Sequence, residues 1–300
     1  MRAGTSLFYH EAAARYGIDR AARMYSATAV ERERILFRFP SVARRCGYVR
    51  LASDADEERD CRAHLAAMRE AGFPASWYEG PLGVGVLVAD DAAIDPLHRC
   101  RLEAAAVSAA GARLFENSPV LRLTTGLVET AIGVVRCRVV VVAVDGGLAS
   151  VLPELGDRVW PMRLQMLASG PHSAAVLPHA IGTRWGWDYA QQLPDGVIAF
   201  GGCRDVGGDG ERTTDATPTE SVQEALSRRF QDVTGEMPDV THRWAATAGY
   251  TADGLPILEQ VRPGIWATGG YCGTGNLLGA ACGRHAVQLA LGSRSDSLLD

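Results

Sequence analysis

Hydrophobic and polar positions along the chain follow two periods, one typical of helices and one typical of strands. Apolar residues recur at helical spacing over 11–36, which predicts one or two helices. They do so again over 56–71, where Ser53 is the expected N-cap. A further helix is expected to begin at Pro96, after the cap Asp95. The other apolar runs predict strands at 46–52, 83–88, 112–116, 138–145, 161–168, 184–190, 196–204 and 265–268.

The strand at 138–145 has the clearest pattern. Residues 139–144 are all apolar, and such a β-branched run is typical of an interior strand whose two faces are both covered. Gly146 and Gly147 end it. The strands between residues 161 and 204 are interpreted as antiparallel, and residues 193–196 form a hairpin turn between the last two. The pattern therefore predicts a mixed α/β fold.

A glycine-rich turn lies near the end of the chain, between a short apolar strand and an apolar helix. Four of its seven residues are glycine, at positions 269, 270, 273 and 275. Glycines let the backbone approach a ligand, and the free N–H groups at a helix start favour an anion. One alternative is a tight turn without a ligand. Another is a nicotinamide-dependent dehydrogenase, which the short remaining chain disfavours because no strand follows to carry a ribose-binding acid.

Composition narrows the class of protein. The 300 residues are 47% hydrophobic, enough for one or two domains with a large core. The net charge of −5 argues against a nucleic-acid surface, and all 30 basic residues are arginine, which excludes lysine Schiff-base chemistry. Seven scattered cysteines without a C-x-x-C pair favour reduced thiols and a cytoplasmic location. Neither a metal site nor a membrane span is expected.

Three pieces of the closing segment carry a recognisable pattern. They are the D-G-x-P turn at 253–256, the strand and double glycine at 264–270, and the turn at 273–277. Together they resemble the D-amino-acid-oxidase-like family of FAD-dependent oxidoreductases. Residues 189–196 and 201–205 are similar to the branch that includes glycine oxidase and the gamma-glutamylputrescine oxidase-like enzymes. The resemblance implies FAD as the cofactor and a Rossmann-like FAD-binding domain interleaved with a substrate domain built on an antiparallel sheet.

The resemblance also implies a discontinuous domain organisation. Residues 1–42, 91–158 and 241–300 would form the FAD-binding domain, and residues 43–90 and 159–240 the substrate domain. The first βαβ unit of such a domain, with its G-x-G-x-x-G turn and acidic ribose ligand, is missing from the sequence. The FAD-binding domain is therefore expected to be incomplete at its N-terminus.

The resemblance further implies which residues contact FAD. The start of the last helix faces the flavin ring, where its dipole favours the negative charge of the reduced ring. The backbone near Val120 contacts the adenine, and Gly146 lies near the cofactor after its strand. The expected cofactor-binding residues are Val120, Gly146, Gly270, Gly273, Thr274, Gly275, Asn276 and Leu277.

Tyr189 and His242 are the candidate catalytic residues. With Trp185 and Trp187 they are expected to line the substrate face, although ordinary packing within the sheet is the alternative for such aromatic residues. Ala248 occupies the position at which amino-acid oxidases often carry an arginine for the substrate carboxylate. That departure favours an amine over a simple amino acid as substrate.

The expected activity is oxidation of a C–N bond in a small amine or amino-acid-like substrate, by hydride transfer to FAD. The alternative is a truncated or split family member that does not bind FAD alone and is inactive, because the missing unit would hold the diphosphate and ribose. A partner chain or a missing N-terminal segment would then complete the FAD site.

Overall fold

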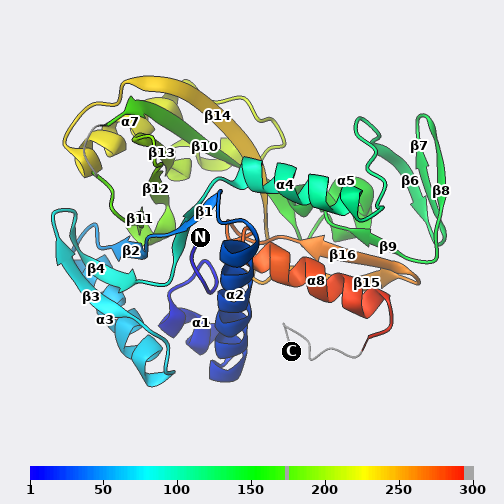
Figure 1. Cartoon of the computed structure of the whole chain (residues 1–300), viewed down its shortest axis with the longest axis horizontal. Coiled ribbons are helices and arrows are strands. Elements are labelled where there is room, and N and C mark those ends of the chain that lie inside the picture. Colours follow the sequence, from blue (N-terminus) through cyan, green and yellow to red (C-terminus); the bar gives the residue numbers. More distant parts are fainter. Residues whose placement is uncertain (173–175, 294–300) are drawn as a thin grey trace.

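The computed structural model describes residues 1–172 and 176–293, and it has the expected mixed α/β fold (Figure 1). The helices are α1 (Tyr9–Tyr16), α2 (Ile18–Arg38), α3 (Ala55–Glu70), α4 (Pro96–Ala109), α5 (Leu148–Val151), α6 (Arg204–Gly207), α7 (Glu220–Thr234) and α8 (Leu278–Ala290). The strands are β1 (Ala43–Arg45), β2 (Tyr48–Leu51), β3 (Ser76–Gly80), β4 (Gly83–Val88), β5 (Ala92–Ile94), β6 (Val120–Thr124), β7 (Leu127–Thr130), β8 (Gly133–Arg136), β9 (Val140–Val142), β10 (Trp160–Pro171), β11 (Ala180–Thr183), β12 (Asp188–Gln192), β13 (Val197–Gly202), β14 (Val240–Tyr250), β15 (Ile257–Arg262) and β16 (Ile265–Gly269).

The largest sheet has eight strands in the order β14-β10-β13-β12-β11-β2-β4-β3. It is antiparallel except where β11 lies parallel to β2. The helix α7 covers one face, and its Leu226 and Phe230 are fully buried in a cluster with Ile198 and Phe200 of β13. The antiparallel sheet inferred from the alternating pattern is therefore present.

A second sheet has the order β15-β16-β9, and α8 packs against it. β9 runs parallel to β16, with Val141 opposite Trp266. The prediction that 138–145 forms an interior strand is wrong for the described residues, in which β9 pairs with β16 alone and only Val142 of its three residues is buried. An apolar run indicates a preference for burial, but it does not fix how many strands lie beside it.

The N-terminal helices join the two sheets. α1 and α2 contact each other, α1 contacts α3, and α2 lies against α8 (Figure 1). Met24 of α2 is fully buried with Leu278 and Ala281 of α8. Glu31 of α2 accepts two hydrogen bonds from Arg284 of α8, at 2.9 and 3.0 Å. The last helix is thus held on one side by the sheet and on the other by α2.

Three local predictions differ from the structure. Asp54, and not Ser53, caps α3, since its carboxylate accepts two backbone N–H groups of the first turn at 2.9 Å. Residues 112–116 form no strand, because their alternating pattern has no neighbouring strand to pair with. Arg184 and Trp185 lie in a 3₁₀ turn with φ of 53° and 55°, and β12 begins only after it.

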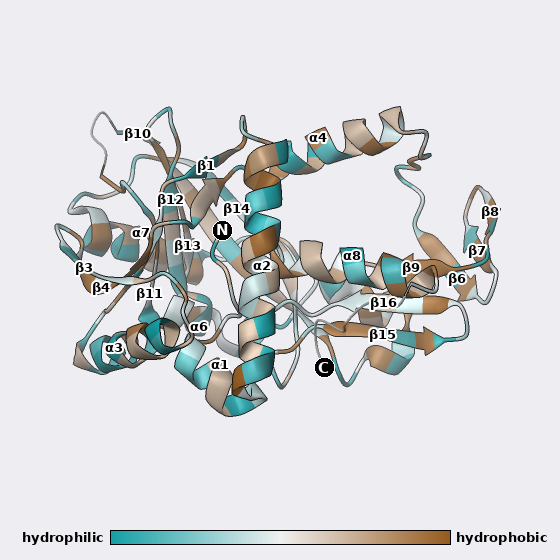
Figure 2. Ribbon diagram, turned by 60° about the horizontal axis from the view of Figure 1, so that its bottom comes forward, coloured by the Kyte–Doolittle hydropathy of each residue, from teal (hydrophilic) through white to brown (hydrophobic). Residues whose placement is uncertain are grey.

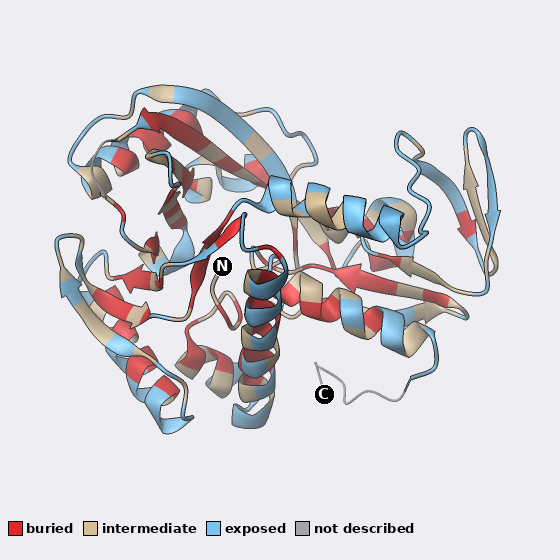
Figure 3. Cartoon of the chain, viewed as in Figure 1, coloured by how far each residue is buried: buried red, intermediate tan, exposed pale blue. Residues whose placement is uncertain are grey.

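The helix α4 is sparsely covered and contacts the rest of the molecule near its start, where Arg99 donates a hydrogen bond to the carbonyl oxygen of Asn276 at 2.9 Å. None of its 14 residues is buried, and its Leu97 and Val107 are exposed (Figures 2 and 3). In the small sheet β6-β7-β8, Leu121 and Val134 are exposed as well. With the open edge of β9, these features leave apolar surface that the described residues do not cover.

Candidate active site

A cavity of about 570 Å³ lies between the large sheet and the turn that precedes α8. Its walls come from the N-terminal segment, from β2 and β10 to β13, and from that turn. The lining is largely apolar and aromatic, including Leu164, Met166, Trp185 and Trp187. This size and character are typical of a site for a small molecule or part of a cofactor.

The turn before α8 presents unpaired backbone donors. The N–H groups of Gly273, Gly275 and Asn276 have no hydrogen-bond partner among the described residues, and Leu277 gives α8 no side-chain cap. Gly273, Thr274, Asn276 and Leu277 line the cavity. Free N–H groups and the helix dipole give this wall partial positive charge, so it favours an electron-rich or anionic group.

Gly146 and Gly270 lie where close backbone contacts fix the start of the turn. The Asp145 carboxylate accepts hydrogen bonds from the N–H groups of Gly249 and Gly270, both at 2.8 Å. A Cβ at Gly146 would lie 3.1 Å from the backbone of Ala248. These contacts join β14, β16 and the segment after β9. The N–H of Gly270 is therefore already paired within the protein, whereas those of Gly273, Gly275 and Asn276 have no partner among the described residues.

Tyr189 lines the cavity, as expected, from β12. Its ring lies across Gly201 of β13, where a Cβ would come within 2.5 Å of the ring. Burial, with a smaller contribution from nearby Tyr250, raises the pKa of Tyr189, so the phenol stays protonated at neutral pH. The neutral hydroxyl is able to donate one hydrogen bond to a ligand and to accept another.

Arg204 and Tyr250, which the sequence analysis did not single out, also line the cavity near Tyr189. Arg204 is the first residue of α6, and its guanidinium lies 4.5 Å from the ring centre of Trp187 and 4.6 Å from that of Tyr250. All three residues line the cavity. The sequence signal for Arg204 was its position two residues after the glycine pair that ends β13, but the contacts that direct it into the cavity are not local in sequence.

Two expected site residues lie outside this cavity. His242 is exposed on β14, with its Nδ1 3.1 Å from the hydroxyl of Thr241, and it does not line the cavity. Val120 is 40% exposed on β6 and is also absent from the lining. Of the two catalytic candidates, the structure places only Tyr189 in the cavity.

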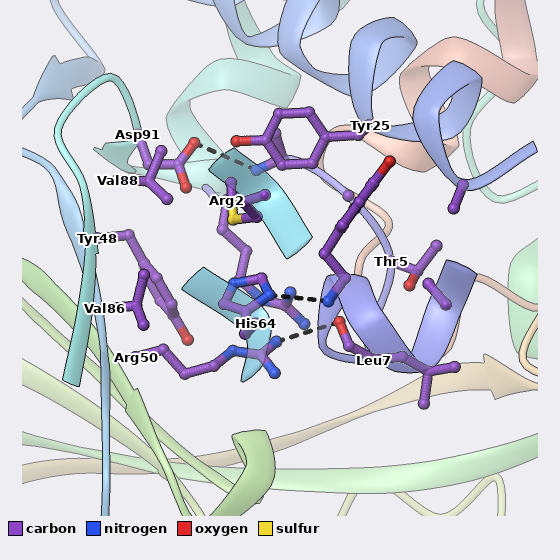
Figure 4. Close-up of a pocket in the computed structure, with 16 residues that line it drawn as sticks. Arg2, Thr5, Leu7, Tyr25, Tyr48, Arg50, His64, Val86, Val88 and Asp91 are labelled. Carbon is purple, nitrogen blue, oxygen red and sulfur yellow. Dashed lines mark hydrogen bonds between the residues drawn. The ribbon is translucent and has the colours of Figure 1, made fainter. Parts of the chain in front are cut away.

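A second, smaller cavity of about 30 Å³ lies beside the first and shares Arg2, Leu7 and Tyr48 with it, between the N-terminal segment, α2 and β2 (Figure 4). Arg50 is 3% exposed there, and burial, with repulsion from Arg2, lowers its pKa to about 10. The lining contains four buried polar atoms without a hydrogen-bond partner in the described protein, namely Thr5 Oγ1, Tyr9 OH, Tyr25 OH and Arg50 Nη1. This volume has room for ordered water, which would satisfy such groups.

The described residues show no arrangement for a metal ion or a membrane span. No cluster of three or more His, Cys, Asp or Glu side chains within 1–172 and 176–293 is placed to hold a metal. In the same part of the chain, no helix combines the length and apolar character needed to cross a bilayer.

Comparison with known proteins identifies the family. The model of the FAD dependent oxidoreductase (DAO) family matches residues 3–289, so the chain belongs to that family. This confirms the expected family and its cofactor, FAD. The free N–H donors before α8 and the aromatic cavity beside them suit a cofactor that has a polar aromatic ring.

Relatives of known sequence or structure agree with this assignment. The chain is 25% identical over 273 residues to the probable oxidoreductase OrdL of Rhizobium meliloti (strain 1021), covering 83% of this chain and 62% of that protein. The chain thus spans about three-fifths of the length of this relative. The fold is similar to glycine oxidase from Geobacillus kaustophilus, with a TM-score of 0.76, 18% identity, and 98% and 88% of the two chains covered. It is similar to L-proline dehydrogenase from P. horikoshii, with a TM-score of 0.77, 17% identity, and 94% and 80% covered.

Proposed function

We propose that this protein is an oxidoreductase that oxidises a C–N bond of a small amine or amino-acid-like substrate with FAD. The observation that carries the proposal is a single cavity lined both by the turn with free donors before α8 and by Tyr189, Trp185 and Trp187. The two structural relatives named above carry amino acids in their names, glycine and proline, which supports this substrate class. When bound, FAD supplies the acceptor for the hydride that leaves the carbon beside nitrogen.

The chain's own residues would bind and orient the reactants. The free N–H groups of Gly273, Gly275 and Asn276 favour negative charge at the α8 wall. Tyr189 presents a protonated hydroxyl that positions a polar group of the substrate. Apolar and aromatic walls exclude water from the space between them.

Several finer expectations remain proposals. The division into an FAD-binding domain (1–42, 91–158 and 241–300) and a substrate domain (43–90 and 159–240) is one of them. Others are the contact between Val120 and the adenine and a cytoplasmic location. Gly146 and Gly270 act in this proposal by shaping the turn, since backbone crowding surrounds the first and Asp145 binds the second.

A second candidate function is that of a family member that needs further polypeptide to hold FAD. The open edge of β9 and the unburied helix α4 favour it, because both leave surface that a neighbouring strand and helix would cover. In that case the chain alone is inactive, and a partner chain or an additional N-terminal segment completes the FAD site.

Absorbance separates the two candidates. Purified protein is mixed with FAD, freed of unbound cofactor, and measured between 350 and 500 nm. A retained flavin spectrum is expected from the first candidate, and a colourless protein supports the second. Asn276→Asp places a carboxylate beside the free donors, and we expect it to weaken FAD binding about fivefold to tenfold. Asn117→Asp, outside the cavity lining, is the control and should leave binding unchanged.

A further inference from the structure

The large cavity carries positive charge. Within the described part of the chain, the lining side chains that are charged at neutral pH are Arg2 and Arg204, and the lining contains no Asp or Glu. Arg2 already donates a hydrogen bond to the carbonyl oxygen of Ser6 at 3.0 Å. A positive site of this kind attracts a ligand with a negative group and disfavours one that carries positive charge alone.

Arg204 is free to bind such a group. Its guanidinium is stacked by Trp187 and Tyr250 and makes no hydrogen bond or ion pair with the described residues. The adjacent Asp205 pairs with Arg184 instead. Stacking occupies the faces of a guanidinium and leaves its N–H edge available for two parallel hydrogen bonds to a carboxylate.

The backbone fixes the direction of Arg204. Cys203 has a left-handed φ of 53°, and its N–H donates to the buried Asp188 carboxylate at 2.9 Å. Asp188 is held in turn by Arg184 at 3.0 Å. At Gly202 a Cβ would lie 2.3 Å from the Asp188 oxygen, so glycine is required there. A preorganised arginine loses little freedom on binding, which strengthens its interaction with a ligand.

We propose that Arg204 binds the carboxylate of the substrate, so that the cavity takes an amino acid or an N-substituted amino acid. The inference rests on the proposed function, in which this cavity is the substrate site. It replaces the expectation, drawn from Ala248, that the substrate is an amine without a carboxylate. Ala248 does not line the cavity, and the positive charge comes instead from Arg204, which follows the end of β13.

Ligand binding tests the assignment without requiring activity. Phenylacetate and its neutral isostere phenylacetamide are titrated into the purified protein by calorimetry. We expect phenylacetate to bind, and Arg204→Gln to weaken it about tenfold to a hundredfold while phenylacetamide binding is unchanged. Arg204→Lys, which keeps the charge but loses the planar edge, should give an intermediate affinity.

The control is Arg212→Gln. Arg212 is exposed and also lies over a tryptophan ring, that of Trp160 at 4.8 Å, but it does not line the cavity. It should leave both affinities unchanged. Equal phenylacetate affinities in the wild type and Arg204→Gln, or no binding to the wild type, would overturn the inference. A protein that binds phenylacetate through Arg204 but retains no flavin would refute the proposed function instead.

Discussion

At the scale of single residues, Gly249 lies close to the Asp145 carboxylate and to the backbone nitrogens of Gly146 and Gly270. A Cβ there would lie 2.7 Å from the Asp145 carboxylate and 2.8 Å from the N–H nitrogen of Gly270. We expect Gly249→Ala to lower the free energy of unfolding by about 2–4 kcal/mol, since it displaces a carboxylate that two backbone donors share. Urea denaturation measures the change.

A matched substitution shows whether crowding is the cause. Gly283 lies inside α8, and a Cβ there meets nothing within 4 Å. Gly283→Ala should therefore raise the free energy of unfolding by about 0.5–1 kcal/mol through helix propensity. If both variants changed stability by the same amount, the contacts described around Asp145 would be wrong.

The residues of the site differ in how far the sequence predicts them. Glycine spacing predicted the turn before α8, because a tight backbone turn depends on residues that are adjacent in sequence. Arg204 was not predicted as a cavity residue. Its direction depends on the left-handed Cys203, on Asp188 and on stacking with Tyr250, and these are brought together only by the fold.

At the scale of elements, the pair of helices α2 and α8 should weaken in acid. Burial opposes ionisation of Glu31, but the guanidinium groups of Arg284 and Arg34 more than offset this, so the pKa of Glu31 is lowered on folding. A carboxylate with a lowered folded pKa contributes its full stability above the unfolded value of about 4.3. It loses that contribution as the pH falls through the folded value.

Glu31→Gln is the corresponding variant. We expect it to cost about 1–3 kcal/mol at pH 7 and to match the wild type at low pH, where Glu31 is protonated. Thermal unfolding from pH 7 down to the acid range measures the difference. Glu58→Gln, which breaks an exposed pair with Arg62, should cost less than about 0.5 kcal/mol. A pH-independent difference for Glu31→Gln would contradict the ionic origin of the contact.

Most elements follow from the period of their apolar residues. α2, α3 and the long strand β10 are present near the expected bounds, because their periods repeat over many residues. Predictions for short segments were wrong more often. The pattern at 112–116 has no partner strand, and the run at 138–145 contributes three residues to an edge strand. Pairing between distant segments is a property of the whole fold, so a local period does not determine it.

At the scale of the whole molecule, the uncovered edge of β9 should make the isolated chain associate. Val144 follows this strand and is 48% exposed. An unpaired edge with apolar neighbours is able to pair with another copy, and a charge beside it opposes such pairing. We expect Val144→Lys to slow the growth of light scattering several-fold on warming. Ile18→Lys, at the exposed start of α2, should have little effect, and equal effects would argue against the edge as the cause.

The helix α4 offers a way to observe the same surface directly. Cys100 lies on α4 and is the exposed thiol among the described cysteines, while Cys61, Cys203, Cys272 and Cys282 are buried. A maleimide dye or a nitroxide would therefore attach first at α4 under brief labelling. The rotational freedom of the attached label would fall if another polypeptide bound to α4. The least covered helix of the molecule would then report assembly.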